Sequence, residues 1–120
     1  MALLEMTLFI SGLYKALKET CSGIDKEKLA FVNAHGTATL FNDQMESIAI
    51  QRAGLADIPI NALKGYFGHT LGAAGVLETI LSMKAVDNHT IIGTRGYQEA
   101  GVSGKVDISA ENRSTDKRSF

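Results

Sequence analysis

At residues 31–39 the chain reads FVNAHGTAT, an apolar run of strand length that leads into a loop of small residues around His35. A second segment, ALKGYFGHTLGAAG at residues 62–75, repeats this design around Lys64 and His69. Loops that follow buried strands often carry active groups in α/β sheets, because the rigid sheet fixes the loop and the loop exposes the side chain. The two segments therefore predict a layered α/β unit in which each of two strands ends in a loop that exposes a histidine.

Helices are predicted on both sides of these segments. Apolar residues at three- and four-residue spacing predict a helix over 3–17. Asp43, followed three residues later by Glu46, predicts a helix that starts near 43 behind a capping box and ends at 53, before Gly54. A third helix is predicted over 73–87, and its apolar side is broad enough for us to expect it to be well buried.

Short apolar runs predict the strands between these helices. They lie at 29–32, 58–63, 91–92 and 106–108, and a glycine-spaced loop is predicted over 65–72. An alternation of helices and strands is typical of an α/β arrangement with layered packing.

Length and composition restrict the class of protein. A chain of 120 residues is long enough for one hydrophobic core, and its 45% apolar residues, 21% charged residues and net charge of -1 give no indication of nucleic-acid or membrane binding. Cys21 is the one cysteine, so an internal disulfide and a structural zinc site are excluded. Glu5 and Lys15 interrupt the one candidate membrane span. We therefore expect a cytoplasmic protein.

The two histidine segments resemble the motifs of one enzyme family. HGTAT with Asn42, Asp43 and Glu46 resembles the HGTGT…ND..E motif of β-ketoacyl synthases. Lys64 with GHTLGAAG at residues 68–75 and then Glu78 resembles the K…GHTLGAAG…E segment of the same family. Two motifs in the same order are far more specific than either alone.

The resemblance covers residues 24–108 approximately and implies a fold and a reaction. The fold is the α/β thiolase-like fold, of which this chain would be the C-terminal half, with layered helices packed on a mixed β-sheet. In this family a cysteine thiolate in the first half takes an acyl group from an acyl carrier protein. A malonyl thioester then loses carbon dioxide and attacks the acyl-enzyme, which gives a β-ketoacyl thioester.

The same resemblance implies roles for single residues. His35 and His69 would donate hydrogen bonds to the thioester oxygen as enolate charge develops. Lys64 would be the active-site lysine, paired with Glu78 and tuning the charge around His69. Asp43 and Glu46 would support the first histidine loop. No cofactor and no metal are implied, and Cys21 and His89 are interpreted as residues without a catalytic role.

The resemblance also implies what the chain does not contain. Residues 1–120 are expected to be the C-terminal domain without the cysteine-bearing half and without the glycine-rich GFGG loop, so the isolated chain is expected to be inactive. The full-length protein is expected to be a homodimer. Two positions depart from the family pattern, since Ala38 replaces the second glycine of HGTGT and Leu63-Lys64-Gly65 replaces Thr-Lys-Ser.

Three alternatives stay open at this point. A thiolase would carry a proline after the second histidine and would lack the HGT-type first histidine, so Thr70 and His35 argue against it. A non-catalytic partner of the chain-length-factor type would keep the fold and lose the cysteine. A free-standing binding module would have to pack by itself. The pathway, fatty acid or polyketide, and the acyl chain are not determined by these residues.

Overall fold

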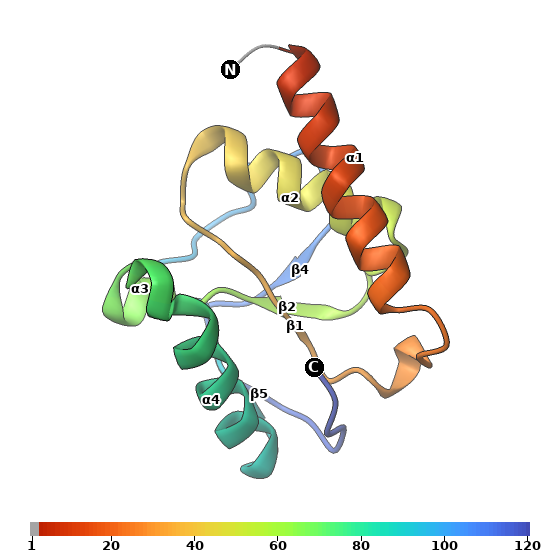
Figure 1. Ribbon diagram of the computed structural model, residues 1–120. Helices are drawn as coiled ribbons and strands as arrows, with labels where there is room; N and C mark the ends of the chain where they lie inside the picture. The colour runs from red at the N-terminus through yellow and green to blue at the C-terminus, as the bar shows by residue number, and fades with distance from the viewer. Residues whose placement is uncertain (1–2) are drawn as a thin grey trace.

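The structure is a computed structural model that describes residues 3–120 (Figure 1). Its α-helices are α1 (Leu3–Thr20), α2 (Leu40–Arg52), α3 (Lys64–Phe67) and α4 (Ala74–Asp87), with the 3-10 turns η1 (Lys26–Lys28) and η2 (Leu71–Ala73). Its strands are β1 (Val32–Asn33), β2 (Pro59–Asn61), β3 (Thr90–Ile91), β4 (Asp107–Ile108) and β5 (Arg113–Ser114). The predicted α/β alternation is confirmed.

A small parallel sheet lies at the centre of the molecule (Figure 1). Its strand order is β1-β2-β4, and the register places Asn33 opposite Asn61. Because both pairings are parallel, the chain leaves β1 and β2 at the same edge of the sheet. The loops that carry His35 and Lys64 therefore start side by side. Strands β3 and β5 form a second, two-stranded sheet, which is antiparallel.

The strand predicted at 29–32 is shifted toward its C-terminal end. Only Val32 of that run belongs to β1, although Ala30 and Phe31 are almost fully buried, as an apolar core run should be. The amide of Ala30 donates to the carbonyl of Ser119 at 2.7 Å, and the rings of Phe31 and Phe120 stack with centroids 5.5 Å apart. The C-terminal residues thus lie beside the start of β1.

The two N-terminal helices pack on each other (Figure 1). Ile10 of α1 and the fully buried Met45 and Ala49 of α2 form a common core cluster. The helix predicted over 3–17 is confirmed and extends to Thr20. No helix within residues 3–120 has the length and apolar character needed to cross a membrane.

The predicted capping box at the start of α2 is wrong. The helix begins at Leu40, and its N-cap, Thr39, makes no side-chain capping bond. Asp43 and Glu46 lie inside the helix, and the carboxylate of Glu46 contacts another loop. The sequence could not separate these cases, because a capping carboxylate and a carboxylate in a tertiary contact have the same spacing. The C-terminal end is as predicted, since Gly54 adopts φ +76° directly after it.

The region around α4 differs from prediction in two respects. The loop predicted over 65–72 contains the one-turn helix α3 and the turn η2. Helix α4 has the predicted bounds, but its apolar side is not well buried, because Val76, Ile80 and Met83 are between 50% and 66% exposed. Its buried residues are mostly small or polar, namely Ala74, Glu78, Ser82 and Ala85, with Val86 as the one larger apolar residue among them.

Candidate active site

The structure brings the two predicted histidines together. His35 lies in the loop that follows β1. His69 lies in the short connection between α3 and η2. Their ring centroids are 5.3 Å apart, and the ring planes meet at 81° in an edge-to-face contact. Both side chains are exposed. Two imidazoles from distant parts of the sequence therefore reach the same solvent-accessible point.

Glu46 fixes the backbone of the first histidine loop. One carboxylate oxygen accepts a hydrogen bond from the amide of His35 at 2.7 Å, and the other accepts from the amide of Gly36 at 3.0 Å. Gly36 has φ +49°, and a Cβ at this residue would collide with the side chain of Ala62 on the neighbouring segment. Glycine is thus required here both by the backbone conformation and by the close approach.

Lys64 contacts the other side of the same loop. Its ammonium group donates to the carbonyl oxygen of His35 at 2.7 Å and to Oε1 of Glu78 at 2.8 Å. The side chains of Lys64 and Glu78 are only 7% and 9% exposed. The backbone of His35 is therefore held at its amide by Glu46 and at its carbonyl by Lys64. The predicted pairing of Lys64 with Glu78 is present, and the ammonium group contacts the backbone of His35.

The loop around His69 sets the orientation and the tautomer of the imidazole. The amide of Leu71 donates to Nδ1 of His69 at 3.1 Å. This bond requires an Nδ1 without a proton, so the neutral ring carries its proton on Nε2 and can donate from there. Thr70 and Leu71 both have positive φ, 55° and 47°. Such left-handed conformations in non-glycine residues are strained and are common at functional sites.

Among residues 3–120, no hydrogen bond joins the side chain of Asp43 to the histidine loop, so the supporting role expected of it stays a prediction. Asp43 lies on α2 one turn before Glu46, and its Oδ1 is buried without a hydrogen-bond partner among the described residues. The sequence motif pointed to α2 as the support of the His35 loop. Within α2, the hydrogen bonds to the amides of that loop are made by Glu46.

Two asparagines that sequence reasoning did not single out join the two loops. The side-chain amide of Asn33 donates to Oδ1 of Asn61 at 3.0 Å, and the amide of Ala34 donates to the carbonyl of Asn61 at 2.8 Å. The side chain of Asn61, which is 1% exposed, also donates to the carbonyl of Ile92. The signal in the sequence is that the same polar residue ends both strands at paired positions.

The remaining candidates lie away from this site. Cys21 follows the C-terminal end of α1 and packs against the core cluster around Leu29 and Ile50. His89 follows α4 and is exposed. Within residues 3–120 no three His, Cys, Asp or Glu side chains are grouped so that they could hold a metal ion. The arrangement is therefore one of two imidazoles supported by a buried ion pair and a carboxylate.

Comparison with known proteins identifies the family of the chain. The family model for the C-terminal domain of β-ketoacyl synthases matches residues 11–98. The chloroplastic 3-oxoacyl-[acyl-carrier-protein] synthase I of Arabidopsis thaliana is 43% identical over 68 residues, which are 55% of this chain and 14% of the relative. The ketoacyl synthase alpha subunit of the tetracenomycin polyketide synthase of Streptomyces glaucescens is 36% identical over 76 residues, 61% of this chain and 18% of the subunit.

A solved structure extends the comparison to the fold. The crystal structure of a β-ketoacyl synthase from Burkholderia phymatum superimposes with a TM-score of 0.81 and 33% sequence identity, over 89% of this chain and 27% of that one. The predicted thiolase-like α/β fold is thereby confirmed. The chain spans about a quarter or less of the length of these relatives. Because the family model matches most of the sequence, the chain belongs to the β-ketoacyl synthase family.

Proposed function

We propose that this chain supplies the His-Lys-His part of the active site of a 3-oxoacyl-[acyl-carrier-protein] synthase. The observation that carries the proposal is the contact between His35 and His69, whose rings meet at 5.3 Å from two loops that are held by independent contacts. Residues 1–120 would be the C-terminal domain of that enzyme, with the nucleophilic cysteine in a part of the protein outside this sequence.

The proposed reaction is a decarboxylative condensation. The bond between the malonyl methylene carbon and its carboxylate breaks, carbon dioxide leaves, and the electron pair moves into an enolate of the thioester. Nε2–H groups of His35 and His69 would donate to the enolate oxygen, which is the group where negative charge develops. The enolate carbon then attacks the carbonyl carbon of the acyl-cysteine and expels the thiolate.

Lys64 acts in this proposal as a positioning residue. Its ammonium group donates to the part-buried carbonyl of His35 and to the buried carboxylate of Glu78. Lys64 and Glu46 together hold the backbone of His35, so the position from which the imidazole extends is fixed. Preorganised donors are effective because they need little rearrangement during the reaction.

The partners and the location are part of the proposal. The substrates would be acyl and malonyl groups on the phosphopantetheine arm of an acyl carrier protein, and the full-length enzyme would be a homodimer in the cytoplasm. Relatives with synthase names favour a catalytic protein over a non-catalytic partner of the chain-length-factor type. A fatty acid and a polyketide pathway both fit, since relatives from both are similar to this chain.

A chimera tests the proposal. Residues 3–120 would replace the matching segment of the Burkholderia phymatum synthase, and β-ketoacyl product would be measured by mass spectrometry of the carrier protein. We expect the chimera to be active, and His35→Ala and His69→Ala each to lower its rate by a factor of about 10² to 10³. His89→Ala is the matched control and should leave the rate unchanged. A folded chimera whose rate is insensitive to both active-site substitutions would refute the proposed roles.

A further inference from the structure

The turn that carries His69 is open to solvent along its whole length. Residues 68–73 are all exposed. Within residues 3–120, the hydrogen bonds of this turn stay inside it or go to the adjoining helices. Examples are the bond from the amide of Leu71 to Nδ1 of His69 and the bond from the amide of Gly68 to the carbonyl of Lys64. The place of the His69 imidazole therefore depends on how those helices are held.

Helix α3, which leads into the turn, is held by two of its four side chains. Lys64 at its start is buried and bound to Glu78. Two residues later, the hydroxyl of Tyr66 donates to the carbonyl of Gly93 at 2.7 Å. Phe67 has no side-chain donor or acceptor. Tyr66 thus makes the last side-chain hydrogen bond between α3 and another element before the turn begins.

The acceptor of this bond belongs to a segment that is fixed on its other side. The amide of Gly93 donates to Oδ1 of Asn112 at 2.8 Å, and the amide of Thr94 donates to the carbonyl of Ser109 at 2.8 Å. A Cβ on Gly93 would collide with the carbonyl of Ala110, so the two backbones are in direct contact. The carbonyl of Gly93 is therefore an acceptor at a defined place.

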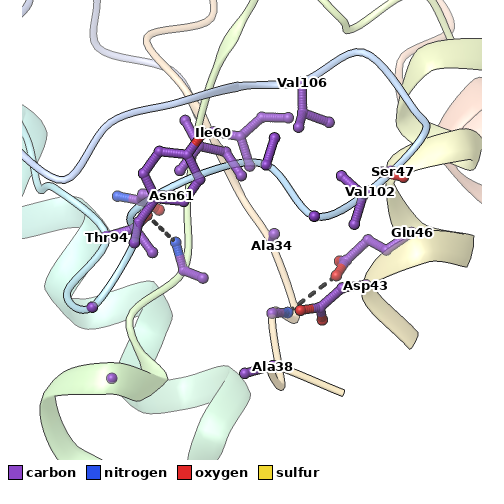
Figure 2. A pocket seen from close by; sticks show the side chains of 18 of the residues that line it. Ala34, Ala38, Asp43, Glu46, Ser47, Ile60, Asn61, Thr94, Val102 and Val106 are labelled. Atoms are coloured by element: carbon purple, nitrogen blue, oxygen red, sulfur yellow. Dashed lines mark hydrogen bonds between the residues drawn. The ribbon is translucent and has the colours of Figure 1, made fainter. Parts of the chain in front are cut away.

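The same segment also runs along the end of β2. The side chain of Asn61 donates to the carbonyl of Ile92 at 3.1 Å, and the hydroxyl of Thr94 accepts from the amide of Ala62 at 3.2 Å. Figure 2 shows Asn61 and Thr94 close together at this end of the sheet. The bond of Tyr66 thus continues a row of contacts that starts in the sheet and ends in α3.

Gly65 allows α3 to lie directly on this segment. A Cβ on Gly65 would stand 2.7 Å from the carbonyl oxygen of Arg95, which is too close for a real side chain. The guanidinium carbon of Arg95 lies 5.9 Å from the centroid of the Tyr66 ring. The family motif has serine at the position of Gly65. The departure from that motif is therefore matched by a close approach between α3 and residues 93–95.

We propose that Tyr66 is a positioning residue of the active site: its hydrogen bond to Gly93 fixes α3, and through α3 the placement of His69 beside His35. Because the hydroxyl is bound to Gly93, it acts through the backbone of α3 and not as a donor to the substrate. The role in catalysis rests on the proposed function, whereas the placement of the imidazole can be measured without any reaction.

Nuclear magnetic resonance of the histidine-labelled chain measures this placement, at a pH where the imidazoles are neutral. In the parent chain we expect a nuclear Overhauser effect between the rings of His35 and His69, whose centroids are 5.3 Å apart. Tyr66→Phe removes only the hydroxyl and should weaken this effect by about twofold or more, because the effect falls steeply with distance. Tyr14→Phe, which removes a hydroxyl on α1, is the matched control and should leave it intact.

Gly65→Ala provides a second, independent variant. Its methyl group has to move α3 away from the carbonyl of Arg95, so the effect between the rings should weaken here too. Gly12→Ala is the control, because a Cβ on Gly12 would meet no atom within 4 Å. The amide spectrum of each variant reports whether it is folded. An unchanged effect between the rings in folded Tyr66→Phe, or in folded Gly65→Ala, would overturn the proposal.

The chimera with the Burkholderia phymatum synthase tests the consequence for catalysis. Tyr66→Phe should lower kcat about three- to tenfold and leave KM for the malonyl carrier protein unchanged, because the imidazole is less well placed while the substrate still binds. A chimera that responds to His35→Ala and His69→Ala but not to Tyr66→Phe would refute the positioning role alone. A chimera insensitive to both histidine substitutions would refute the proposed function, and the effect between the rings would then decide the placement by itself.

Discussion

Lys64 shows how one buried side chain connects the stability of the chain with its candidate site. The ion pair with Glu78 is almost completely removed from water, and the same ammonium group serves the carbonyl of His35. Removing one member of such a pair leaves a buried charge without a partner. The cost of that substitution therefore reports how strongly the site is built into the core.

We expect Lys64→Met to lower the free energy of unfolding by about 3–5 kcal/mol in urea denaturation. The double variant Lys64→Met, Glu78→Gln should recover part of this loss, because the unpaired charge is gone. Lys105→Met is the control, since Lys105 and Asp57 pair with side chains 70% and 89% exposed and should contribute less than about 1 kcal/mol. Equal effects of Lys64→Met and Lys105→Met would contradict the burial argument.

Ala38 stands at the position of the second glycine of the family motif and has φ +58°. An L-residue in this conformation is less stable than glycine, because its Cβ lies close to the backbone carbonyl. Ala38→Gly should therefore raise the free energy of unfolding by about 0.5–1 kcal/mol, measured in the same urea experiment. Ala100→Gly, in an exposed segment and without a positive φ, should lower it instead. A destabilised Ala38→Gly variant would show that the methyl group is needed.

At the scale of elements, α2 is the support of the first histidine loop. Glu46→Gln keeps the length of the side chain but replaces one carboxylate oxygen by a donor, so only one of the amides of His35 and Gly36 retains its acceptor. We expect at least one of these two amides to exchange with deuterium several-fold faster, while the amide of Ala49 in the same helix is unchanged. Unchanged exchange at both loop amides would mean that the loop is held without Glu46.

The long helices could be predicted because their spacing and end signals are local in sequence. The start of α2 could not be, because Glu46 uses its carboxylate for His35, a partner that the helix pattern does not contain. Strand β5 was absent from the prediction, because its two residues lie in a polar segment and pair only through their contact with β3. The helix α4 has apolar residues on several sides, so its periodicity did not indicate which side is buried.

In the candidate site, too, the residues could be predicted from local motifs and their contacts could not. His35, Lys64 and His69 could be selected from the sequence, because each lies in a short motif of recognisable composition. Their mutual contacts depend on the parallel register of β1 and β2, which places the two loops side by side. That Lys64 binds the backbone of His35 is therefore a property of the sheet and could be obtained only from the structure.

At the scale of the whole molecule, the candidate site is open to solvent. His35 and His69 are both exposed, and Cys21 packs in a core cluster at the end of α1, so the chain presents two donors to water and no thiol beside them. Donors of this kind stabilise an oxyanion strongly only in a site from which water is excluded.

The chain alone is therefore expected to form no β-ketoacyl product when it is incubated with acyl- and malonyl-carrier protein and the carrier protein is analysed by mass spectrometry. The Burkholderia phymatum synthase in the same mixture is the positive control for substrates and detection. The Cys21→Ser variant should be equally inactive. Product that forms with the parent chain and disappears in Cys21→Ser would show that this thiol reaches the histidines. Product that persists in Cys21→Ser would show that the two imidazoles suffice without a cysteine nucleophile. Either result would contradict the proposal that the nucleophilic cysteine lies outside this sequence.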